Sequence, residues 1–192
     1  GIADLARRMM AIARQPEVRN HRVQVHVGVS SFVPKPFTPF QWAAQDPIDR
    51  LEEKQRQLTL LLRDRKITLN WHDAKTSRLE AVFARGDRRL GRVLLRAVRA
   101  GCMLDGWDEC FRFDRWQQAF DDCGLSMAFY ADRPRDRSEI LPWDHIDCLV
   151  EKDFLWREWE RAQAGKVSPS CRDGCGRCGA DRLMGGNCSA TG

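Results

Sequence analysis

Four cysteines lie near the end of the 192-residue chain, at Cys171, Cys175, Cys178 and Cys188. The first three have the spacing C-x3-C-x2-C, with glycines between and beside them. Closely spaced thiolates in such a loop can reach one metal ion or iron–sulfur cluster, because glycine lets the backbone turn tightly. We therefore expect a metal or cluster here, with Cys188 or a residue such as Asp181 completing the ligand set. The spacing alone does not choose between zinc and iron–sulfur.

A second candidate group is the pair His72 and Asp73, which follows a short apolar segment. The histidine titrates near neutral pH and the aspartate could orient its imidazole, so the two are candidate catalytic residues. An aspartate in this place is also typical of an ordinary turn, and both interpretations stay open. His26 is expected to be a hydrogen-bonded core residue instead.

A third candidate group is a basic turn in which Arg85, Arg88 and Arg89 surround Gly86 and Asp87. Guanidinium forks match carboxylates and phosphates, so the turn could clamp an anion. Local pairing of aspartate with arginine at a solvated helix start explains the same residues equally well.

The elements that position these groups follow from the hydrophobic pattern. Apolar residues at helical spacing predict an amphipathic helix over 2–14, whose inner face is expected to be Ile2, Leu5, Met9 and Ile12. Alternating valines from Val23 to Val29 predict a strand. Asp46 is expected to cap a helix that begins at Pro47 and ends near Arg65, and a second strand is expected over 67–71.

The rest of the chain is expected to be mostly helical. Ser77 and Glu80 form a capping-box pattern, which predicts that a helix begins there. Three more helices are expected, one ending before Gly101, one opened by Asp114 and one over 153–164. The loop over 31–42 contains three prolines and four aromatic residues, so it is expected to be rigid and to follow the carboxyl end of a strand, where ligands bind in α/β folds.

Composition narrows the class of protein. Hydrophobic residues make up 43% and charged residues 31%, which is typical of a globular chain and excludes a disordered or fibrous one. The net charge of +5 is spread along the chain rather than gathered into the dense basic stripe of a dedicated nucleic-acid binder. No apolar run approaches the roughly 18 residues that span a bilayer, so no membrane partner and a cytoplasmic location are expected.

Several runs together resemble the C-terminal part of radical S-adenosylmethionine (SAM) proteins that carry a cobalamin-binding domain. The run over 26–42 resembles the last barrel strand of that family and the loop after it. Further runs that resemble this family lie at 71–73, 79–89, 105–107 and 141–159. The tail shares the C-x3-C-x2-C spacing of the family's SAM-cluster loop but is not expected to be that loop, since in the family the loop precedes most of the fold and only 14 residues of this sequence follow Cys178.

The resemblance implies a fold and an activity. The fold class is α/β, a C-terminal fragment of a partial (β/α)6 radical-SAM barrel. The last helix–strand–helix unit covers 1–65, a mostly helical extension covers 66–165, and a glycine- and cysteine-rich tail covers 166–192. In the complete protein, SAM is cleaved reductively at a [4Fe–4S] cluster, and radical modification or methylation of an unknown substrate follows.

The resemblance also implies partners and cofactor contacts. Residues at the end of the last barrel strand lie beside SAM in the family, so candidate contacts are Val29, Ser30, Ser31, Phe32 and Pro36. The cluster-binding cysteines and the cobalamin domain would belong to an upstream half of the same polypeptide, and without it this chain is not expected to cleave SAM. The tail would hold an auxiliary iron–sulfur cluster or zinc. The alternative is a non-catalytic zinc-knuckle module that binds RNA.

Overall fold

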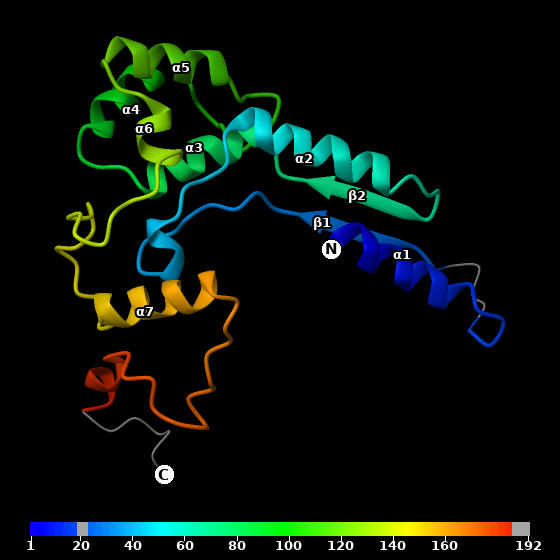
Figure 1. Ribbon diagram of the computed structural model, residues 1–192. Coiled ribbons are helices and arrows are strands. Elements are labelled where there is room, and N and C mark those ends of the chain that lie inside the picture. Colours follow the sequence, from blue (N-terminus) through cyan, green and yellow to red (C-terminus); the bar gives the residue numbers. More distant parts are fainter. Residues whose placement is uncertain (19–22, 186–192) are drawn as a thin grey trace. The chain divides into compact units, whose positions relative to one another are not determined.

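The computed structural model describes residues 1–18 and 23–185 (Figure 1). These form two compact units. Unit 1 comprises Gly1–Val33 and Asp46–Glu80, and unit 2 comprises Pro34–Gln45 and the residues from Ala81 onward. The fold is mixed α/β and mostly helical, with one small parallel sheet. None of its helices within the described residues is long and apolar enough to cross a membrane.

The helices and strands follow the expected order with one addition. The main elements are α1 (Ile2–Ala13), β1 (Val25–Val29), α2 (Ile48–Leu61), β2 (Ile67–Trp71), α3 (Ala74–Ala84), α4 (Leu90–Arg99), α5 (Phe113–Asp122), α6 (Met127–Ala131) and α7 (Lys152–Gln163). Two short 3-10 helices, η1 (Pro39–Trp42) and η2 (Ala180–Met184), complete the described chain. The one-turn helix α6 was not expected from the sequence, because five residues are too few for a periodic pattern.

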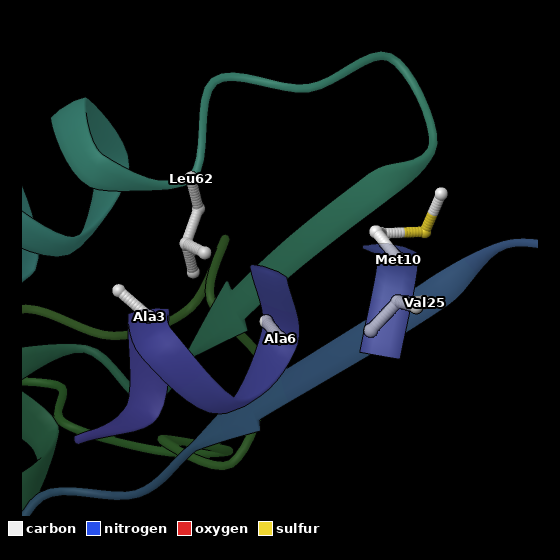
Figure 2. Packing of buried hydrophobic residues seen from close by; sticks show 5 residues of the cluster. All are labelled: Ala3, Ala6, Met10, Val25 and Leu62. Carbon is white, nitrogen blue, oxygen red and sulfur yellow. The ribbon is translucent and has the colours of Figure 1, made fainter. Parts of the chain in front are cut away.

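Unit 1 is built on two parallel strands. β1 pairs with β2 in a register that sets Val25 against Ile67 and Val29 against Trp71. Odd-numbered side chains of both strands share one face of the sheet, since side chains alternate along a strand. The core cluster on this face joins Ala3, Ala6 and Met10 of α1 to Val25, and Leu62 at the end of α2 completes it (Figure 2). Both helices therefore cover the same face of the sheet.

The helix α1 was predicted correctly, but its predicted inner face is wrong. Ile2, Leu5, Met9 and Ile12 are between 47% and 60% exposed, whereas Ala3, Ala6 and Met10 are buried. The two alanines let the helix lie close to the strand and to α2, and a stripe of larger side chains could not approach as closely. The larger apolar stripe faces away from the core of unit 1.

Two predicted helix starts are also corrected. α3 begins at Ala74, and its first turn is capped by Asp73, whose Oδ1 accepts the backbone N–H of Thr76 at 2.9 Å. Ser77 lies inside the helix and is buried, so the predicted capping box there is wrong. α2 begins one residue later than expected, with Pro47 in the N-cap position.

In unit 2 the proline-rich segment is an anchor. Trp42, at the end of η1, is 1% exposed and packs with Leu141, Trp143 and Leu155. The Oε1 atom of Gln41 accepts hydrogen bonds from the Trp143 indole at 2.7 Å and from the backbone of Phe37 at 3.1 Å. The segment is therefore held in place, because hydrogen bonds to Gln41 and the packing of Trp42 fix it against α7 and the loop before α7.

Two buried arginines hold the end of α3 in unit 2. Arg85 is fully buried and donates to the carbonyls of Ala131 at 2.8 Å and Arg133 at 2.9 Å. Arg135, also buried, donates in turn to the Arg85 carbonyl. The next residue after Arg85 must be glycine, since a Cβ on Gly86 would meet Leu90 Cδ1 at 2.1 Å and the Val82 carbonyl at 2.9 Å.

Truncation of Met10 tests the core of unit 1. Met10→Ala removes a side chain that is 2% exposed, and we expect the free energy of unfolding to fall by about 2–4 kcal/mol. The matched control is Met9→Ala, because Met9 is 50% exposed on the same helix and should change stability by less than about 0.5 kcal/mol. Urea unfolding followed by circular dichroism measures both, and equal losses in the two variants would contradict the packing described here.

Candidate functional site

The carboxyl ends of the two strands bring two predicted groups together in unit 1. Val29 ends β1 and pairs with Trp71, which ends β2. The backbone N–H of His72 donates to the Val29 carbonyl at 3.2 Å, so Ser30 and His72 leave the sheet at the same edge. Both residues are exposed there. This edge is where ligands bind in parallel α/β folds.

The other candidate cofactor contacts continue from this edge. Ser31 is half-buried, and Phe32 is 48% exposed in an extended segment. Pro36 is half-buried and belongs to unit 2. The structure therefore places Val29 and Ser30 beside His72 at the strand ends, with Ser31 and Phe32 following along the chain, and it places Pro36 in the proline-rich segment of unit 2.

Asp73 has a structural task. Its Oδ1 accepts both the backbone N–H and the hydroxyl of Thr76, at 2.9 and 3.2 Å. These contacts cap α3, which is the turn interpretation of this residue. The His72 carbonyl is held by the side-chain amide of Gln55 at 3.0 Å, and its imidazole is exposed. The strand end thus presents a histidine next to an aspartate that is engaged elsewhere.

His26 is not the core residue that its strand position suggested. It lies on the even-numbered face of β1 with Gly28, opposite Thr68 and Asn70 of β2. All four residues are exposed. The sheet therefore has an apolar face covered by α1 and α2 and a polar face that carries a histidine, an amide and a hydroxyl.

The cysteine tail folds back on α7 in unit 2. The backbone N–H of Glu151, just before α7, donates to the Cys178 carbonyl at 2.8 Å. Arg157 of α7 approaches the carbonyls of Gly176 and Arg177 at 3.4 and 3.5 Å. Cys171, Cys175 and Cys178 all line one hollow of about 560 Å³ beside α7. Thus the structure brings three of the four predicted ligands to one cavity.

The turn around Cys175 has features that suit a thiolate. The backbone N–H of Arg177 donates to the Cys175 Sγ at 3.4 Å, and such bonds to sulfur stabilise a metal-bound thiolate. Gly179 has a φ of 88°, which glycine adopts without strain, and Arg177 also has a positive φ of 54°. Cys171 and Cys175 are exposed and Cys178 is half-buried.

The three thiols do not yet form a ligand set. Within residues 1–18 and 23–185, no group of three or more His, Cys, Asp or Glu side chains is arranged to hold a metal ion. Cys188, the predicted fourth ligand, lies outside the described residues, and Asp181 lies in the first turn of η2. The donor chemistry fits zinc or an iron–sulfur cluster, whereas the side chains would have to rotate toward a common centre to bind it.

The basic turn after α3 is largely used internally. Arg85 is the buried clamp already described, and burial, with Arg135 and Arg133 nearby, lowers the pKa of its guanidinium to about 10. Arg89 is paired with Asp87 at 2.7 Å, and its hydrogen bonds hold the pKa of that carboxyl below its usual range. Arg85 and Arg89 therefore have structural roles and are not free to clamp an anion, while Arg88 is exposed.

A carboxylate compensates the buried arginines. Glu139 forms a two-pronged ion pair with Arg133, at 2.6 and 2.7 Å, and lies 3.9 Å from Arg135. The hydrogen bonds from Arg133 hold the pKa of Glu139 below its usual range. Neither Glu139 nor Arg135 was singled out from the sequence, because their partners are 4 to 50 residues away and no local pattern marks them.

Comparison of the chain with protein-family models, with curated proteins and with solved structures finds no match.

The Glu139 ion pair predicts a pH dependence of stability. Because the folded-state pKa of Glu139 is lowered, its contribution is present above its unfolded value, about 4.3, and is lost as the pH falls through the folded value. We expect Glu139→Gln to lower Tm at pH 7, and the difference from the wild type to narrow between about pH 5 and pH 3. Thermal melts across this range measure it, with Glu160→Gln on the exposed side of α7 as control. A difference that stays constant with pH would contradict the assignment.

Proposed function

We propose that this chain is the C-terminal part of a radical SAM enzyme, in which unit 1 forms the end of the barrel. The observation that carries the proposal is the placement of α1 and α2 on one face of the β1–β2 sheet. In a doubly wound sheet, helices cover both faces, whereas in a barrel they all lie outside and the other face lines the interior. Both helices of unit 1 lie on one face, which agrees with the second pattern and supports the proposal.

The uncovered surfaces of unit 1 support the same proposal. A parallel sheet is normally buried on both faces, yet here the even-numbered face with His26 and Asn70 is exposed. The sheet has two strands within the described residues, so each strand has one edge without a neighbour. The apolar stripe of α1 that faces away from the core, with Leu5 and Met9, is also exposed. Upstream strands and helices of a barrel would cover all three surfaces.

The proposal gives the strand ends a role. Residues from Val29 to Phe32 would contact SAM, and His72 would stand beside them at the same edge of the sheet. Pro36, in unit 2, is the remaining candidate contact. The reductive cleavage of SAM is chemistry that a [4Fe–4S] cluster supplies when bound by upstream residues, and the upstream domain would also hold cobalamin if the enzyme uses it. This chain would close the barrel and shape the substrate pocket.

The tail would serve as a separate metal centre. Cys171, Cys175 and Cys178 line one hollow, and Cys188 would supply a fourth thiolate. An auxiliary iron–sulfur cluster and a structural zinc both suit four thiolates.

Metal binding by the tail is tested on the 192-residue chain. After anaerobic treatment with iron and sulfide, or with zinc, we expect about one cluster or ion per chain and loss of most of it in Cys175→Ala. Cys110→Ala is the control, because Cys110 is half-buried outside the tail. Metal analysis and the visible absorption spectrum distinguish iron–sulfur from zinc. Equal metal content in both variants would contradict a site at the tail.

The enzyme proposal is tested first by DNA sequencing and then by an activity assay. The DNA upstream of the codon for Gly1 should continue the reading frame and encode a C-x3-C-x2-C loop. The complete protein, purified without oxygen and supplied with a reductant, should then release 5′-deoxyadenosine from SAM. Serine substitutions in the upstream loop should abolish this release, while Cys175→Ala should leave it measurable.

The opposite results favour the alternative function. A stop codon directly upstream, together with salt-dependent RNA binding by the zinc-loaded chain, would replace the enzyme proposal by a zinc-knuckle RNA-binding module.

A further inference from the structure

The helix α4 of unit 2 presents two neighbouring stripes to the outside. Leu90, Val93 and Ala97 are buried and fix the orientation of the helix. With 3.6 residues per turn, arginines spaced four and three residues apart share one outer side of the helix. This arginine stripe consists of Arg92, Arg96 and Arg99 of α4, together with Arg88 in the turn before the helix, and all four are exposed. From Arg92 to Arg99 the stripe is about 10 Å long.

The arginine stripe is poor in opposite charge. Arg92, Arg96 and Arg99 line a hollow of about 250 Å³ between α4 and the end of α5, where Asp122 is the one carboxylate of the lining. The side-chain amide of Gln118 donates to that carboxylate at 2.8 Å. Among the described residues, none of the four stripe arginines has an ion pair or a side-chain hydrogen bond, unlike Arg89 beside them. The three arginines of this hollow therefore share one carboxylate, that of Asp122, which already accepts a hydrogen bond from Gln118.

An apolar stripe runs beside the arginines. Leu94 and Val98 are 44% and 56% exposed, on the side of α4 between the arginine stripe and the core. Leu95 is 52% exposed and lies next to the arginines, since it lines the same hollow. Gly91 stands in line with Leu94 and Val98, and a side chain there would meet no atom of the described residues within 4 Å. The residues Gly91, Leu94 and Val98 are spaced by three and four, which is the spacing of a seam between two packed helices.

We propose that α4 is a docking surface for an acidic amphipathic helix of a protein partner. Apolar residues of that helix would pack on Leu94, Leu95 and Val98, with Gly91 allowing close approach, and its carboxylates would pair with the arginine stripe. Interfaces between proteins combine apolar side chains with arginine in this way. Because the arginines recur along α4, their ion pairs with carboxylates of the partner would also fix the register of the two helices.

Other occupants explain less of the surface. A nucleic-acid strand would use the arginines, but single strands stack their bases on aromatic side chains, and α4 contains none. A second copy of this chain packed through α4 would set one arginine stripe against another, and like charges repel. The proposal does not depend on the radical-enzyme function of the whole protein.

The test is a selection of helical peptides on the full 192-residue chain. A display library of amphipathic helices, with random charged residues beside a fixed apolar seam, is enriched on the wild-type protein. We expect the enriched peptides to be acidic beside the seam. The variant Arg92→Glu/Arg96→Glu/Arg99→Glu should bind them at least tenfold more weakly. The control, Arg8→Glu/Arg50→Glu/Arg63→Glu, has the same change of charge at exposed positions of unit 1 and should bind within twofold of wild type.

Further measurements separate the contributions. Leu94→Gln/Val98→Gln should also weaken binding at least tenfold without changing the charge, and circular dichroism shows that each variant is folded. Raising the salt from 0.1 to 0.5 M should weaken binding to the wild type more than to the arginine variant.

Several results would overturn the proposal. Enriched peptides without acidic excess, or equal binding to the arginine variant, would remove the role of the stripe. If labelled polyuridine bound through these arginines while no peptide was enriched, the surface would be a nucleic-acid site. A dimer in solution that the arginine variant abolishes would assign the surface to self-association.

Discussion

Unit 2 depends on a guanidinium that is buried with carbonyls as its partners. Arg85 holds the segment from Ala131 to Arg133 at the end of α3, and Arg135 closes the arrangement by donating to the Arg85 carbonyl. Burying two like charges is costly unless they are hydrogen-bonded and compensated. The carboxylate of Glu139 supplies the compensating negative charge. It forms an ion pair with Arg133 and lies 3.9 Å from the guanidinium of Arg135. Loss of either arginine would leave carbonyls and a charge without partners in the interior.

The same clamp connects the proline-rich segment to the rest of unit 2. The backbone N–H of Arg135 donates to the Trp42 carbonyl at 2.9 Å, and that of Gln45 donates to the Ala131 carbonyl at 2.8 Å. Arg135 also lies 5.1 Å from the ring centre of Trp143, a favourable cation–π position. Because the cysteine tail folds against α7, which packs on η1, its placement traces back to this arginine pair.

The sequence predicted where helices and strands lie better than it predicted which side of each helix is buried. Strands and most helices followed from alternation and helical periodicity, which are local signals. The buried side of α1 did not, because the periodic stripe with the largest side chains was assumed to face the core, whereas close packing selected Ala3 and Ala6. The cap of α3 was misplaced for a similar reason, since Asp73 and Ser77 both suit a helix start and the structure uses the first. Long-range partnerships such as Arg85 with Arg133 leave no local trace.

The two-stranded sheet has a practical consequence for handling the chain alone. Each strand has one row of backbone N–H and C=O groups without a neighbour among the described residues, and Val25, Val27 and Val29 favour extended pairing. Such edges are templates for edge-to-edge aggregation between molecules. The isolated polypeptide should therefore precipitate on concentration, and a short β-strand peptide that occupies the free edge of β1 should keep it dispersed.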